Sequence, residues 1–154
     1  MTIRTAHVGD LAVLVRMGLR FIATSSYRGT IPASAEQLGT LVAWLLDQGG
    51  IFVAVDDEGD EPIGMLAATV IVHPMSGELV ASEVAWWIEP EFRGGSAGLR
   101  LLAAAEAWAR AQGATRFQMI APAGSSVGAL YRRRGYAELE TTWQRPLEGE
   151  SDAE

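Results

Sequence analysis

The hydrophobic pattern changes its period between residues 86 and 102, and this change constrains the fold more than any other feature of the sequence. Residues 80–88 favour a strand, which Pro90 ends. Three glycines follow within residues 94–98, and apolar residues then recur at helical spacing as far as Ala109. This order predicts a strand, a glycine-rich loop and an amphipathic helix in direct succession.

The remaining elements follow from apolar periodicity and from the positions of glycine and proline. Strands are expected at residues 2–5, 51–55, 63–72, 80–88, 117–121 and 136–144, and helices at residues 11–25, 34–48, 98–113 and 125–134. The acidic turn after residue 55 makes the second and third strands a hairpin. The order β-α-α-β-β-β-α-β-α-β predicts an α/β (α+β) fold, with a mixed sheet and helices on both faces.

Some side chains have expected structural roles. Asp10 is a candidate N-cap of the first helix, and Ser34 with Gln37 resembles a capping box at the start of the second. Three tryptophans are expected in the core: Trp44, Trp108 and Trp143.

The length of 154 residues suits one domain, which we expect to span residues 1–147. The net charge is −7, but four acidic residues lie within residues 148–154, so the rest of the chain carries −7 + 4 = −3. An end of this composition predicts an acidic disordered tail.

Composition excludes several kinds of site. The chain has no cysteine, and all twelve basic residues are arginine, so thiolate, Schiff-base and Walker-loop lysine chemistry are ruled out. Two histidines, His7 and His73, are too few for a histidine metal cluster, and we expect no metal site. No basic stripe, long apolar run or secretory signal is visible, which predicts a cytoplasmic protein that binds neither nucleic acid nor membrane.

The glycine-rich loop suggests an anion site. Glycines at a helix N-terminus let backbone N–H groups converge on a phosphate, although a tight turn before an ordinary helix explains them equally well. A Walker loop is excluded by the absence of lysine. The Rossmann fingerprint does not fit because the spacing differs and the loop comes late in the chain.

Two motifs carry a family resemblance. The first motif covers residues 88–98, of which residues 88–94 read I-E-P-E-F-R-G and residues 93–98 read R-G-G-S-A-G. The second motif covers residues 127–136, which read V-G-A-L-Y-R-R-R-G-Y. This resembles the GNAT superfamily of N-acetyltransferases, whose signature is V-x-P-x-x-R-G with Q/R-x-x-G-x-G/A, followed by A-x-x-L-Y-x-x-x-G-F/Y. Ser96 replaces the first glycine of the family loop, Val127 replaces an alanine, and Gly124 replaces a frequent asparagine.

The resemblance implies a mostly antiparallel sheet and acetyl-CoA as the acetyl donor. The loop amides would hold the diphosphate of acetyl-CoA, and the strand backbone before the loop would bind its acetyl and pantetheine groups. The cofactor-binding residues implied are Trp86, Ile88, Arg93, Gly94, Gly95, Ser96, Ala97 and Gly98. Part of the run 132–134, three arginines, would meet the 3′-phosphate, unless the run is only a solvated helix face.

Glu83 is the expected general base for the acceptor amine. Strict alternation would place it on one face of its strand with Ala85 and Trp87. The carboxylate could equally be a solvated residue or the partner of an arginine. Glu36 or Asp47 could act instead through water.

Tyr131 is the expected general acid for the CoA thiolate, with an aromatic anchor as the alternative role. The predicted function is acetyl-CoA-dependent N-acetylation of a primary amine on a small molecule or peptide. The alternative is a non-catalytic acyl-CoA-binding regulatory domain of the same fold. The identity of the acceptor stays open, and a homodimer is one option.

Overall fold

The computed structural model describes residues 1–147, so the expected acidic tail lies outside the described residues. The chain divides after Gly124 into two compact units, which are described separately below. None of the helices within residues 1–147 has the length and apolarity needed to cross a membrane.

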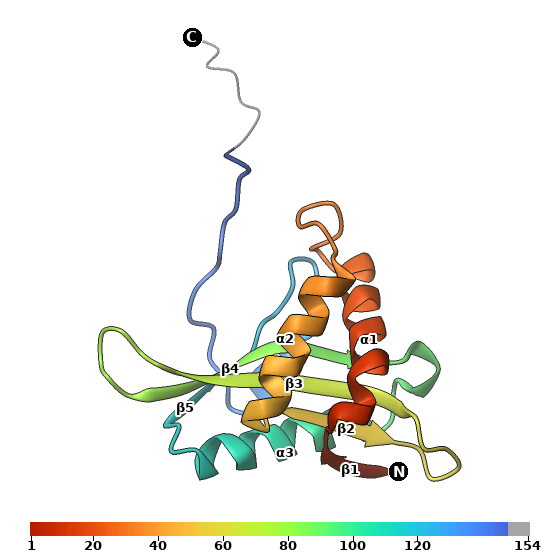
Figure 1. Ribbon diagram of the computed structural model, residues 1–154. Coiled ribbons are helices and arrows are strands. Elements are labelled where there is room, and N and C mark those ends of the chain that lie inside the picture. Colours follow the sequence, from red (N-terminus) through yellow and green to blue (C-terminus); the bar gives the residue numbers. More distant parts are fainter. Residues whose placement is uncertain (148–154) are drawn as a thin grey trace. The chain divides into compact units, whose positions relative to one another are not determined.

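The first unit is built on a five-stranded sheet whose strands follow chain order (Figure 1). The strands are β1 (Thr2–Thr5), β2 (Ile51–Val55), β3 (Pro62–Val72), β4 (Leu79–Ile88) and β5 (Arg116–Gln118). The first four pair antiparallel and only β5 runs parallel to its neighbour β4. The expected mixed, mostly antiparallel sheet is therefore confirmed.

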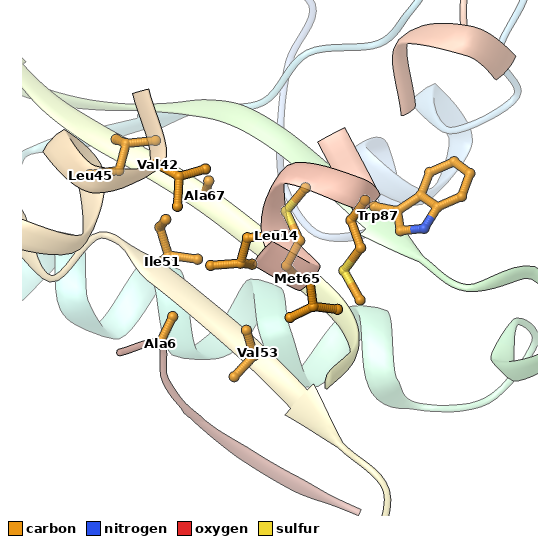
Figure 2. Packing of buried hydrophobic residues seen from close by; sticks show 11 residues of the cluster. Ala6, Leu14, Val42, Leu45, Ile51, Val53, Met65, Ala67 and Trp87 are labelled. Atoms are coloured by element: carbon orange, nitrogen blue, oxygen red, sulfur yellow. The ribbon is translucent and has the colours of Figure 1, made fainter. Parts of the chain in front are cut away.

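Helices cover both faces of this sheet. The helices α1 (Leu11–Thr24) and α2 (Ala35–Gln48) pack on one face, where Leu14 and Leu45 lie in one buried cluster with Ile51 of the sheet (Figure 2). The helix α3 (Ala97–Ala111) packs on the other face, through a second cluster that includes Leu101. Burial of each such side chain contributes about 1.5–3 kcal/mol.

The ends of α2 follow the sequence. Of the two hydrogen bonds of the expected capping box, the structure gives the one from Gln37 N–H to the Ser34 hydroxyl, at 3.2 Å, and Gly49 ends the helix at a φ of 71°.

Asp10 does not cap α1 with its side chain. Its buried carboxylate instead accepts two hydrogen bonds from Arg4, at 2.7 and 2.9 Å, and one from His7 N–H. The residue is already the end of a short 3₁₀ turn, η1 (Val8–Asp10), so its side chain points back toward the turn rather than forward into α1.

The second unit contains one helix, α4 (Gly128–Arg133), within its described residues. The expected strand over residues 136–144 is wrong, because the described chain has no strand after β5. Residues such as Thr141 and Thr142 favour strands only where a neighbouring strand pairs with them, and no such ladder forms here.

Tryptophan positions also depart from expectation. Trp44 is 51% exposed and Trp143 is 91% exposed, so neither lies in the core. Trp108 does pack inward, with its ring centroid 6.1 Å from that of Phe52.

Candidate active site

The strands β4 and β5 pair over only three positions, from Val80 opposite Arg116 to Ser82 opposite Gln118. The strand β4 continues for six further residues, from Glu83 to Ile88. In the described part of the chain, β5 does not accompany this second half of β4. The two parallel strands therefore part directly after Ser82.

The backbone direction of the second half of β4 follows from one hydrogen bond. Glu89 N–H donates a hydrogen bond of 2.9 Å to the carbonyl of Ile63. Ile63 lies in β3, directly before the residues that pair with β4. Because N–H and C=O groups alternate sides along a strand, those of Trp86 and Ile88 point away from β3. These are the two backbone positions expected to bind the acetyl and pantetheine groups.

A β-bulge changes the face on which Glu83 lies. Ala67 of β3 pairs with Ala85, but the next residue, Ala68, pairs with Glu83, so Val84 is an extra residue in β4. Paired residues share a face, and Ala68 belongs to the cluster under α3. Glu83 therefore lies on the α3 face.

Strict alternation, which would place Glu83 with Ala85 and Trp87, is wrong at this position. Ala85 and Trp87 pack with the α1 and α2 cluster, and the extra residue Val84 packs there too. Glu36 and Asp47 are exposed on α2, over the opposite face from Glu83. The structure does not bring these two alternative bases together with Glu83.

Glu83 is buried, with 6% of its surface exposed. Its Oε2 atom accepts a hydrogen bond of 2.9 Å from the backbone N–H of Ile120, two residues after β5. Burial raises the pKa of Glu83 to about 7, and the Ile120 N–H opposes part of this rise because it stabilises the charged form. A carboxyl group with this pKa can both accept and release a proton near neutral pH.

The glycine loop follows β4 through a short 3₁₀ turn, η2 (Pro90–Phe92). Gly94 has a φ of 87°, a conformation that favours glycine. A Cβ atom added at Gly94 or Gly95 would meet no atom within 4 Å. The space over both residues is open.

The helix α3 begins at Ala97 without a side-chain cap from Ser96. The first helical hydrogen bond there runs from Arg100 N–H to the carbonyl of Ser96, so the preceding N–H groups of α3 have no acceptor within the helix. Open space over the glycines and an uncapped helix N-terminus together suit a phosphate group.

Gly98 has a different role from the other loop glycines. A Cβ atom there would lie 3.1 Å from the ring of Trp86. Close packing of α3 against the Trp86 side chain therefore favours a glycine at this position.

The side chain of Arg93 is directed to β4. Its guanidinium lies 4.6 Å from the ring centroid of Trp87, and its Nε donates a hydrogen bond of 2.8 Å to the Ile88 carbonyl. Arg93 therefore attaches the loop to the strand that precedes it.

Tyr131 lies in the second unit, on α4, and is buried. Its ring centroid is 5.8 Å from that of Tyr136. Arg132 pairs with Glu138 at 3.6 Å, so this arginine is engaged within its own unit.

Sequence reasoning missed two contributors to the site. The Ile120 N–H is a backbone group and leaves no trace in residue identity. Glu89 could have been noticed in the sequence, because a carboxylate stands between the end of a strand and Pro90. In the structure Glu89 is buried, with 7% of its surface exposed.

One family model and several solved structures match this chain. The model of the acetyltransferase (GNAT) family matches residues 18–136. No curated protein sequence matches significantly. Among solved structures, a probable acetyltransferase is 19% identical, with a TM-score of 0.76 and coverage of 97% of this chain and 100% of that one.

Two further structures show the same fold. An aminoglycoside antibiotic 6′-N-acetyltransferase from Acinetobacter haemolyticus is 20% identical, with a TM-score of 0.72 and coverage of 97% and 100% of the two chains. A transcriptional regulator from Bacillus halodurans is 19% identical, with a TM-score of 0.72 and coverage of 95% and 99%.

Proposed function

Because the chain belongs to the GNAT family of acetyltransferases, we propose that it transfers an acetyl group from acetyl-CoA to a primary amine of a small molecule or peptide. The amine would attack the thioester directly. The observation that carries the proposal is Glu83, a buried carboxylate of pKa about 7 at the point where β4 and β5 part.

Acetyl-CoA would be held mainly by backbone groups. The loop from Arg93 to Gly98 would surround the diphosphate, as the open space over Gly94 and Gly95 supports. The N–H groups of Trp86 and Ile88, directed away from β3, would bind the pantetheine arm and polarise the acetyl carbonyl. Arg93 would contribute by fixing the loop to β4.

Glu83 would accept the proton of the acceptor amine. An alkylammonium group has a pKa near ~10, so most acceptor molecules are protonated at neutral pH and must lose a proton before attack. A carboxylate with a pKa of about 7 accepts this proton more readily than an ordinary glutamate does. Tyr131 would then protonate the departing CoA thiolate through its hydroxyl.

The acceptor would be a cationic amine, since the chain outside its acidic end carries −3. The solved aminoglycoside 6′-N-acetyltransferase supports N-acetylation as a reaction that this fold accommodates. We further propose a cytoplasmic location and a homodimer; exposed Leu139 and Trp143 in the second unit support the latter. Light scattering on the purified protein tests the homodimer.

The function is tested by CoA release from acetyl-CoA in the presence of a panel of amines. We expect release that depends on a cationic amine and a rise in melting temperature with CoA, because a ligand of the folded state stabilises it. A thermal shift without release by any amine would favour the non-catalytic acyl-CoA-binding domain. An absent shift at millimolar CoA would reject both functions.

A further inference from the structure

Glu89 joins three elements at the end of β4. Its N–H donates to the Ile63 carbonyl at 2.9 Å, and its own carbonyl accepts from Phe92 N–H at 2.9 Å, which closes the 3₁₀ turn η2. Its side chain, 9% exposed, accepts a hydrogen bond of 2.5 Å from Nη1 of Arg20 on α1. One residue thus connects β3, the turn before the glycine loop, and α1.

The same helix carries a second ion pair of a different kind. Arg16, one turn before Arg20, pairs with Glu61 in the loop between β2 and β3. The two arginine side chains are equally exposed, at 50% and 51%, but Glu61 is 65% exposed. Exposed pairs of this type contribute little, whereas a buried carboxylate that loses its cation becomes an uncompensated charge.

Glu89 lies five residues before Gly94, and the chain between them is attached at both ends. Glu89 is held by Arg20 at the start, and Arg93 is held by the Ile88 carbonyl and the Trp87 ring at the end. A movement of Glu89 would therefore be passed to the glycines through a short, tethered segment. The neighbouring Pro90 further limits the conformations available to that segment.

We propose that the ion pair between Arg20 and Glu89 positions the glycine loop for the diphosphate of CoA and couples that loop to α1. Arg20 is a positioning residue in this view, since it acts through Glu89. The proposal rests on the proposed function, because it requires that the loop binds CoA.

Reciprocity follows from this coupling. If α1 holds the loop in its binding conformation, then bound CoA must in turn stabilise the contact of α1 with Glu89, since two coupled equilibria affect each other equally. A merely structural pair would lower stability by the same amount with and without CoA. The two roles are therefore distinguished by measurements on the CoA-bound protein.

The experiment compares the full chain with the variants Arg20→Met, Glu89→Gln, Arg20→Met/Glu89→Gln and the matched control Arg16→Met. The dissociation constant of CoA is measured by calorimetry well below each melting temperature. We expect Arg20→Met to bind CoA at least about fivefold more weakly, the lower range of typical coupling. We expect Arg16→Met to bind within about twofold of the wild type.

The double variant tests whether Arg20 acts through Glu89. We expect Arg20→Met/Glu89→Gln to bind CoA no more weakly than Arg20→Met, because removal of the carboxylate removes the uncompensated charge. If the double variant instead weakened CoA binding by the product of the factors measured for the two single variants, the proposal would be overturned. CoA should also slow amide hydrogen exchange in α1 of the wild type, and less so in Arg20→Met.

Equal CoA affinity in Arg20→Met and the wild type would refute the positioning role, even if the variant melts at a lower temperature. An equal loss of CoA affinity in Arg16→Met would also refute the positioning role, because the effect would then come from removing any positive charge from α1. Failure of the wild type itself to bind CoA would reject the proposed function, a result distinct from these two.

Discussion

The backbone N–H of Ile120 donates a hydrogen bond of 2.9 Å to Oε2 of Glu83, directly beyond the residues over which β4 and β5 pair. This hydrogen bond favours the charged carboxylate, whereas burial disfavours it and has the larger effect. The pKa of Glu83 therefore lies at about 7, and its charge changes within the range of ordinary cellular pH.

Replacement of Glu83 by Gln should remove a base from the reaction. In the wild type, kcat/KM should rise with pH through about 7 as Glu83 loses its proton. In Glu83→Gln, the rate at pH 7 should fall by roughly 10²-fold, and the loss should shrink at high pH, where free amine is abundant. The measurement is a pH–rate profile for both proteins, with Glu36→Gln as the control. An unchanged profile would transfer the role of base to water or to Glu36.

The same substitution should stabilise the fold at high pH. Because the folded-state pKa of Glu83 is raised from 4.5 to about 7, the folded protein holds a proton that the unfolded chain has lost, and stability falls as pH rises between these values. Glu83→Gln has no carboxyl group at this position, so it does not lose stability in this way as the pH rises. Its free energy of unfolding should match the wild type below pH 4.5 and exceed it by roughly 3 kcal/mol above pH 7. Urea unfolding at pH 4.5 and pH 8 checks this, and equal differences at both pH values would contradict it.

Gly95 and Gly98 should respond differently to substitution. Gly95→Ala meets no atom within 4 Å and has no positive φ, so stability should be unchanged or slightly higher. Its CoA affinity should nevertheless fall, since the new methyl group would occupy space needed by the diphosphate. Gly98→Val should instead push against Trp86 and lower stability by about 1–3 kcal/mol. Melting temperature and CoA titration separate these effects, and unaltered CoA binding in Gly95→Ala would argue against a diphosphate at that position.

Tyr131→Phe should separate proton donation from packing. The ring, which is buried and lies 5.8 Å from that of Tyr136, is kept, so the melting temperature and CoA affinity should change little. The value of kcat should fall by roughly 10²-fold if the hydroxyl protonates the thiolate. Steady-state kinetics with saturating acetyl-CoA measure this. Activity within about twofold of the wild type would assign Tyr131 to packing alone.

Several features of the fold could be predicted because they depend on contacts between neighbours in sequence. The Ser34 cap and the Gly49 end of α2 need only a few adjacent residues. The strand, glycine loop and helix around Gly94 were recognised from spacing for the same reason. The element order as far as α4 followed from these local signals, whereas the GNAT family was indicated by the resemblance of residues 88–98 and 127–136 to its motifs.

Other features depend on which distant residues meet. The sequence could not show that Val84 is an extra residue in β4, because a bulge is set by the register with β3, and this register decides on which face Glu83 lies. It could not show the Ile120 N–H beside Glu83 or the Arg20 partner of Glu89, which come from residues 37 and 69 positions away. The strand expected over residues 136–144 failed for the same reason, since propensity makes a strand only where a paired neighbour exists. The sequence by itself thus determined the elements as far as α4, the glycine loop and the family. Tertiary packing decided the face, the partners and the pKa of the site residues, because burial and pairing arise only between segments far apart in the chain.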